Sequence, residues 1–196
     1  MPSTPLANGT AAGATALLIT DMISRWRFPE GRPLLLQAAR IAPAIAALKA
    51  RCRRAGVPVI YANDNQGMWR SDFRHVVEDA LARGGTGARI ALQLAPDDDD
   101  YFVLKPKRSG FFATPLDLLL RHLAVRRLIV TGVASDQCVA HTAADARLRD
   151  YDVVVPSDCI AANSADRNRR ALRHLEEAVR VPTTPGPRIR LPAGRG

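Results

Sequence analysis

The sequence predicts an α/β domain in which a parallel sheet is covered by helices on both faces. Apolar runs of strand length alternate with patterns of helical spacing along most of the chain. The strand candidates are continuous apolar runs, which is typical of parallel strands buried on both faces. Helices of ten or more residues separate them, as the right-handed crossovers between parallel strands require. The 196 residues suffice for one full core and are too few for two full-sized domains.

Five strands and five helices are expected, in alternation. The strands span residues 16–21, 57–62, 101–104, 127–131 and 151–155. The helices span residues 34–55, 73–83, 115–123, 137–149 and 165–178. The first helix has apolar residues at helical spacing and ends before Gly56, the residue type that most often follows a helix. Residues 84–100, rich in Gly and Asp, are expected to be mostly connection.

The two ends of the chain are expected to lie outside a domain that spans residues 16–184. Residues 1–15 carry no basic residue, so they lack the charged start of a secretory signal and are expected to form a flexible leader. Residues 185–196, rich in Pro, Gly and Arg, are expected to form a flexible tail. A sixth, short strand is expected just before this tail, near residues 179–183.

Composition narrows the class of protein. Cys52, Cys138 and Cys159 form no C-x-x-C pair and cannot all pair within one chain, so a reducing, cytoplasmic location is expected. No apolar run approaches the roughly 20 residues that span a bilayer, so no membrane partner is expected. The net charge of +9 permits nucleic-acid binding. However, the arginines are scattered without interleaved aromatic residues, which favours a solvated basic surface and no nucleic-acid partner.

Three chemically capable side chains follow the expected strands. Asp21 comes after the first strand, Lys105 after the third and Cys138 after the fourth. Ligands of open parallel sheets bind outside the carboxyl ends of the strands, so these side chains are candidates for one site. Neither a G-x-G-x-x-G segment after the first strand nor a phosphate-binding P-loop is present, so no nucleotide cofactor is expected.

Cys138 lies where a strand turns into a helix. The first turn of a helix carries partial positive charge, and together with a nearby lysine it is expected to favour the thiolate. Backbone N–H groups of the same turn can receive the oxyanion that forms when sulfur attacks a carbonyl. Asp21 can act as a general base towards the thiol and as a general acid towards a leaving amine. Cys52 and Cys159 lack such a setting and are expected to be structural.

Three segments of the chain resemble the motifs of the isochorismatase-like cysteine hydrolases, in the order of that family. Residues 17–22, LLITDM, resemble the first-strand motif that ends in an aspartate. Residues 103–111, VLKPKRSGF, resemble the lysine motif, with a serine four residues after the lysine. Residues 132–139, GVASDQCV, resemble the nucleophile motif. The similarity extends from about residue 17 to residue 184.

The resemblance implies a fold and a catalytic arrangement. The expected fold is a three-layer α/β/α sandwich with six parallel strands in the order 3-2-1-4-5-6. Cys138 would attack a carbonyl and form a thioester, Asp21 would shuttle protons, and Lys105 would lower the pKa of the thiol. A cis peptide between Val133 and Ala134 would direct the N–H groups of Ala134 and Cys138 into an oxyanion hole. Association into homo-oligomers is common in the family and is expected here.

A second lysine lies near the expected site, and the metal-binding motif of the nicotinamidases is incomplete in this chain. Lys107 is a rival for the role of Lys105, but the spacing to Ser109 and the immediate exit from the strand favour Lys105. Nicotinamidases of the family bind a divalent metal through an Asp-x-His pair after the second strand. Here Asp64 is followed two residues later by Gln66, so no metal and no other cofactor are expected.

The cysteine at position 138 favours acyl chemistry on a small amide, imide or carbamoyl compound. Two alternatives stay open: an isochorismatase that cleaves a vinyl ether, and a basic nucleic-acid-binding module. The expected partner is a small-molecule substrate. The residues expected to line its pocket are Trp26, Phe28, Asn63, Trp69 and Phe111.

Overall fold

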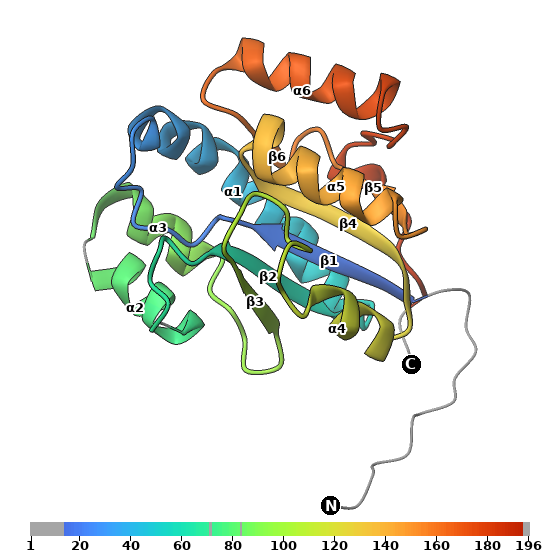
Figure 1. Ribbon diagram of the computed structural model, residues 1–196, viewed down its shortest axis with the longest axis horizontal. Helices are drawn as coiled ribbons and strands as arrows, with labels where there is room; N and C mark the ends of the chain where they lie inside the picture. The colour runs from blue at the N-terminus through green and yellow to red at the C-terminus, as the bar shows by residue number, and fades with distance from the viewer. Residues whose placement is uncertain (1–13, 71, 83, 194–196) are drawn as a thin grey trace, which may run out of the picture.

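A parallel sheet of six strands forms the centre of the computed structural model, which describes residues 14–70, 72–82 and 84–193 (Figure 1). The strands are β1 (Ala14–Thr20), β2 (Val59–Asp64), β3 (Tyr101–Lys105), β4 (Val125–Val133), β5 (Asp152–Val154) and β6 (Ile160–Ala161). All strand pairs in this sheet are parallel, and the order is β3-β2-β1-β4-β5, with β6 beside β4. The predicted α/β fold with a parallel six-stranded sheet is confirmed.

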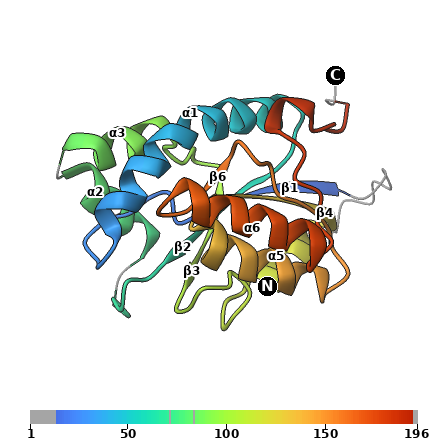
Figure 2. The same ribbon diagram turned by 90° about the horizontal axis from the view of Figure 1, so that it is seen from above.

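Helices cover both faces of this sheet, which gives three layers (Figure 2). The α-helices are α1 (Gly31–Arg54), α2 (Phe73–Ala82), α3 (Gly85–Gln93), α4 (Leu116–His122), α5 (Ala140–Arg147) and α6 (Ala165–Glu177). Helices α1, α2 and α3 pack on one face, and α4, α5 and α6 on the other. Leu17 and Ile19 of β1 belong to the first core, whereas Leu18 between them belongs to the second. Side chains alternate across a strand, so a continuous apolar run buries both faces of the sheet.

Helix α3 lies in the stretch that was expected to be mostly connection, so that expectation is wrong. Its residues Ile90 and Ala91 are buried in the core shared with α1 and α2. Gly84 precedes it at a φ of +63°, and two further glycines occupy its first turn. Glycine disfavours helices locally, so the helix depends on burial of its few apolar residues against α1.

The sixth strand is also not where it was expected. Residues 179–183 form no strand, although Val155 N–H donates to Pro182 O at 3.0 Å and Ser157 N–H to Thr183 O at 3.4 Å. This segment therefore runs beside the end of β5, but the ladder stops because Pro182 has no N–H to donate. Strand β6 instead pairs with the end of β4, where Gly132 is opposite Ile160.

The expected flexible ends differ in what the structure describes of them. Residues 1–13 of the predicted leader lie outside the described residues, and Ala14 begins β1. Part of the predicted tail is packed: Gly186–Arg188 form a 3-10 turn, and Ile189 is buried. Arg51 of α1 holds this turn by donating to Gly186 O at 2.7 Å and to Ile189 O at 2.8 Å. Burial of Ile189 and the two hydrogen bonds from Arg51 thus hold this part of the tail against the domain, although its composition is polar.

Helix α1 is, within the described part of the chain, the one helix whose length and composition would allow it to cross a membrane. Its stripe of apolar residues, which includes Ile41, Ile45 and Leu48, is buried in the core beside the sheet. Its last turn carries Arg51, Arg53 and Arg54. A helix that covers a sheet satisfies the same test of length and composition.

Candidate active site

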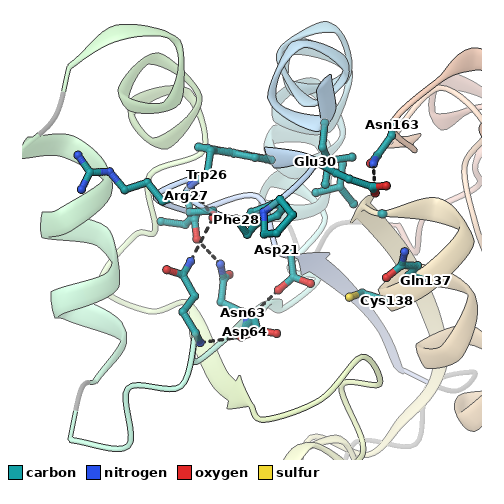
Figure 3. Close-up of a pocket in the computed structure, with 17 residues that line it drawn as sticks. Asp21, Trp26, Arg27, Phe28, Glu30, Asn63, Asp64, Gln137, Cys138 and Asn163 are labelled. Atoms are coloured by element: carbon teal, nitrogen blue, oxygen red, sulfur yellow. Dashed lines mark hydrogen bonds between the residues drawn. The ribbon is translucent and has the colours of Figure 1, made fainter. Parts of the chain in front are cut away.

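The three side chains predicted to form a site meet at the carboxyl ends of the strands. Lys105 Nζ lies 2.8 Å from Asp21 Oδ2 and 3.5 Å from Cys138 Sγ. Figure 3 shows the Asp21 and Cys138 side chains pointing towards the same space from the loop after β1 and the turn after β4. These residues lie in three separate segments of the chain, and the parallel sheet brings them together because its strands end at one edge.

A close approach of two strands places the Asp21 carboxylate and the turn that carries Cys138 next to each other. Gly132 has a φ of +107°, and a Cβ atom there would lie 2.0 Å from Thr20 O of β1. The position therefore requires glycine. Asp21 follows Thr20 directly, and its Oδ1 accepts a 2.7 Å hydrogen bond from the Asp64 N–H. The carboxylate is thus held from the β2 side while its other oxygen faces Lys105.

Lys105 is fully buried and surrounded by oxygen and sulfur atoms. Besides Asp21 and Cys138, its Nζ donates to Lys107 O at 3.2 Å and lies 3.8 Å from Asp64 Oδ2. Burial alone would lower the pKa of Lys105, but the negative charge of Asp21, with further contributions from Cys138 and Asp64, outweighs it and the pKa is raised. Lys105 is therefore a cation at neutral pH. The Lys107 side chain is exposed, and only its carbonyl reaches the site.

The Cys138 thiol does not have the lowered pKa that the sequence led us to expect. Burial, and after it the charge of Asp21, raise its pKa to about 12, although Lys105 acts in the opposite direction. The expectation was wrong because it counted the helix turn and the lysine but not the loss of water around the sulfur. Burial also raises the pKa of Cys52 to about 12. A thiol in this environment needs a base to become a nucleophile at neutral pH.

The turn that carries Cys138 has an unusual backbone. The Val133–Ala134 peptide bond, where the resemblance implies a cis bond, is cis. Ser135–Val139 then form one π-helical turn that continues into α5. Ala134 O accepts hydrogen bonds from the N–H groups of Gln137, at 3.0 Å, and Val139, at 3.2 Å. The carbonyl of Ala134 is thereby engaged inside the turn and does not face the cavity.

A cavity of about 480 Å³ opens beside Cys138 (Figure 3). This volume is within the range of small-molecule sites. Three of the five predicted pocket residues, Trp26, Phe28 and Asn63, line it. Trp69 does not, since its side chain is 78% exposed and belongs to a separate hollow. Phe111 does not either, since it is buried against Tyr151 in the core on the other face of the sheet.

The cavity also has lining residues that sequence reasoning missed. They include Ile23, Ser24, Glu30, Gln66, Gln137 and Asn163. Each lies in a segment that follows a strand, namely β1, β2, β4 or β6. Position after a strand end was therefore the available signal, whereas aromatic character was a poor guide because aromatic residues pack equally well in the core.

The residues after β2 do not fit the metal site that an Asp-x-His pair would form. Gln66 stands at the histidine position, and its Nε2 donates to Ser24 Oγ at 3.1 Å. Within the described ranges, no group of three or more His, Cys, Asp or Glu side chains is arranged to hold a metal ion. His75 of α2, the nearest histidine along the sequence, is exposed and pairs with Asp72, the residue just before that helix. No step of the chemistry below is therefore assigned to a metal.

Comparison with known proteins identifies the family. The family model of the isochorismatase domain matches residues 15–185. The chain belongs to the isochorismatase family. It is 40% identical over 164 residues to the uncharacterised isochorismatase family protein YaaI of Bacillus subtilis, an overlap that covers 84% of this chain and 90% of that protein.

Two further relatives are named for the amides on which they act. Ureidoacrylate amidohydrolase RutB of Enterobacter is 44% identical over 78 residues, which cover 40% of this chain and 34% of RutB. The crystal structure of N-carbamoylsarcosine amidase from Thermoplasma acidophilum aligns with a TM-score of 0.67 at 25% identity, covering 90% of this chain and 98% of that one. This isochorismatase-family member is a hydrolase.

Proposed function

We propose that this family member is a cysteine amidohydrolase that hydrolyses a small amide, imide or carbamoyl compound through Asp21, Lys105 and Cys138. The observation that carries the proposal is the position of Lys105 Nζ, 2.8 Å from Asp21 Oδ2 and 3.5 Å from Cys138 Sγ, behind these two residues, which line the cavity. An acid, a cation and a thiol at these distances can divide proton transfer, charge stabilisation and nucleophilic attack among them.

In the first half of the proposed reaction, the sulfur attacks the substrate carbonyl. Asp21 takes the thiol proton as the bond from Cys138 Sγ to the carbonyl carbon forms, because a pKa of about 12 leaves the resting thiol protonated. The Lys105 cation stabilises the negative charge that develops on sulfur. The N–H groups of Ala134 and Cys138 are proposed to bind the carbonyl oxygen as it becomes an oxyanion. The carbon–nitrogen bond then breaks, and Asp21 gives its proton to the leaving nitrogen.

In the second half, water hydrolyses the thioester. Asp21, again a carboxylate, accepts a proton from a water molecule that attacks the thioester carbon. The carbon–sulfur bond breaks, the proton returns to Cys138, and the acid product leaves. The net reaction consumes one water and releases an amine or ammonia. The names of RutB and of the N-carbamoylsarcosine amidase support amide and carbamoyl substrates for this fold and family.

A screen of primary amides, imides, ureas and carbamoyl compounds for release of ammonia or amine tests the proposal. Activity found in the natural chain should fall by at least about 10³-fold in Cys138→Ala, since the nucleophile is lost. Cys159→Ala is the matched control, because Cys159 is fully buried and lies outside the cavity lining. Turnover that survives Cys138→Ala would contradict the proposal, and turnover of isochorismate that survives it would favour vinyl-ether cleavage instead.

We extend the proposal to the location, assembly and partners of the enzyme. We expect a cytoplasmic homo-oligomer that binds a small molecule and neither nucleic acid nor membrane. Light scattering after size exclusion measures the oligomeric state. Binding to duplex DNA that falls steeply with salt would contradict the expectation about nucleic acid.

A further inference from the structure

The charges around the cavity are mostly negative, although the chain as a whole carries a net charge of +9. Asp21, Asp64 and Glu30 line the cavity. Asp136 lies two residues before Cys138, outside the cavity lining, and its side chain is 21% exposed. The basic character of the molecule therefore does not extend to the place where a substrate would bind.

The two cations in contact with these carboxylates are already engaged. Lys105 is fully buried between Asp21 and Cys138 and is absent from the cavity lining. Arg167 of α6 donates from Nε to Asp136 Oδ2 at 2.7 Å and from Nη1 to Glu30 Oε2 at 3.3 Å. Four carboxylates thus face these two cations, and Arg27 is a third cation at the cavity, so an excess of one negative charge remains around it.

Arg27 is the remaining cation at the cavity, and its position does not favour an anionic ligand near the sulfur. It is exposed, and within the described residues it has no ion-pair partner. Figure 3 shows its side chain directed away from Asp21 and Cys138. A carboxylate close to the scissile carbonyl would therefore meet Asp64 and Glu30 rather than a guanidinium.

Asn63 and Asp64, on the wall that β2 supplies, present hydrogen-bond acceptors, whereas Trp26 Nε1, also in the lining, is a buried donor without a partner among the described residues. Asn63 is buried, its Nδ2 donates to Ile23 O at 2.5 Å, and its Oδ1 has no partner among the described residues. Asp64 follows it in the lining, with a side chain that is 45% exposed. A buried acceptor without a partner is costly unless a ligand donates to it. These atoms suit a ligand that presents N–H groups.

We propose that the substrate of this site is an uncharged or cationic amide that carries N–H donors and has no carboxylate near the scissile carbonyl. The proposal rests on the proposed amidohydrolase function and narrows its substrate class. The Asp64 carboxylate and Asn63 Oδ1 accept hydrogen bonds from the N–H groups of the substrate. The apolar side chains of Ile23, Phe28 and Leu34 pack against its uncharged part.

Two alkylating reagents of nearly the same shape and different charge test this proposal without knowledge of the natural substrate. Iodoacetamide is neutral and iodoacetate is an anion. Each forms a bond from Cys138 sulfur to its CH₂ carbon, iodide leaves, and the thiol proton passes to Asp21 or to water. Peptide mass spectrometry measures the rate at Cys138 itself. The ratio of the two rates is then divided by the same ratio for free glutathione at the same pH and ionic strength.

The corrected preference is the iodoacetamide-to-iodoacetate rate ratio at Cys138 divided by the same ratio for glutathione. We expect it to be at least ten. Glu30→Gln and Asp64→Asn should each lower this preference by threefold or more, because each removes a negative charge from the wall. Glu177→Gln is the matched control, since Glu177 is exposed at the end of α6, outside the cavity lining, and the preference should not change.

Three results would overturn the inference. The first is a corrected preference for iodoacetate, and the second is a preference that neither Glu30→Gln nor Asp64→Asn alters. The third is turnover of ureido acids that exceeds turnover of their primary amides and is lost in Arg27→Ala. That third result would leave the amidohydrolase function intact. Conversely, Cys138 can prefer iodoacetamide strongly while no amide turnover depends on Cys138. That combination would contradict the proposed function and support only the negative charge of the cavity.

Discussion

Single residues set the protonation state of the candidate site, and Lys105 contacts both Asp21 and Cys138. A fully buried ammonium would be unstable alone, but here Asp21, Asp64 and the Lys107 carbonyl surround it. The same cation acts to lower the pKa of Cys138, but burial and Asp21 act in the opposite direction and outweigh it, so the pKa is raised. The thiol stays protonated at rest, so the geometry favours proton transfer to Asp21 over a thiolate that exists before substrate binds.

Removal of this cation should slow alkylation of Cys138. In Lys105→Met the pKa of the thiol rises further, and each unit lowers the thiolate fraction about tenfold at neutral pH. We expect the rate with iodoacetamide to fall at least about tenfold. Lys107→Met is the matched control, because it removes an exposed charge and keeps the carbonyl that contacts Lys105. Equal slowing in both variants would contradict the assigned role, and circular dichroism checks that both are folded.

At the level of residues, the sequence predicted which side chains meet at the candidate site better than it predicted which residues line the cavity. Asp21, Lys105 and Cys138 were predictable because strand ends in a parallel sheet converge. Trp69 and Phe111 were misplaced because an aromatic side chain near a strand end fits a core, a surface or a pocket equally well. The raised pKa of Cys138 was not predictable, since desolvation depends on atoms from several elements.

Among the elements, the contact between β1 and β4 is the one that brings the segments of Asp21 and Cys138 into register. Thr20 pairs with Gly132, and the chains approach so closely that only a hydrogen atom fits on the Gly132 Cα. Asp21 follows on one strand, and the cis peptide and π-helical turn follow on the other. A shift of either strand would therefore move Asp21 relative to Cys138.

Gly132→Ala should destabilise the fold strongly. The new Cβ would lie 2.0 Å from Thr20 O at a φ of +107°, so both a clash and an unfavourable backbone conformation are introduced. We expect a loss of more than about 3 kcal/mol in the free energy of unfolding, measured by urea denaturation. Gly56→Ala is the control, with a φ of +66° but open space around the Cβ, and should cost about 1 kcal/mol. Similar losses in both would show that the strand approach is not tight.

The elements themselves were predictable where a long, regular pattern is present. Helix α1 was expected to within a few residues because its apolar stripe continues over many turns. Helix α3 was not predicted because its glycines disfavour a helix locally, and this short helix depends on contacts with α1. The position of β6 was missed because two residues of strand, Ile160–Ala161, carry no periodic pattern and form only where β4 offers a partner.

For the whole molecule, several thiol, phenol and ammonium groups whose pKa is raised in the folded state make stability depend on alkaline pH. Burial raises the pKa of Cys52 and Cys138 to about 12, from an ordinary value of 9.0, and that of Tyr61 to about 12, from 10.0. The pKa values of Lys49 and Lys105 are also raised, from 10.5, because their carboxylate partners outweigh burial. Burial also raises the pKa of the Cys159 thiol, so these six groups hold their protons more tightly in the folded state than in the unfolded chain.

Stability should therefore fall above about pH 9. Below that pH both states keep these protons and the contribution is fully present. Above it the unfolded chain loses protons that the folded protein retains, which favours unfolding as the pH approaches the folded-state values. We expect the free energy of unfolding in urea to fall by at least about 1 kcal/mol between pH 8 and pH 10.5. A constant or rising value over this range would contradict the burial assigned to these groups.

The central claim is that Cys138 is the residue that carries the acyl group during turnover. Rapid acid quenching of the enzyme with a substrate found in the amide screen, followed by peptide mass spectrometry, tests it directly. We expect a thioester adduct on Cys138 that disappears with hydroxylamine and is strongly reduced in Asp21→Asn. An adduct on another residue, or undiminished turnover in Cys138→Ala, would contradict it.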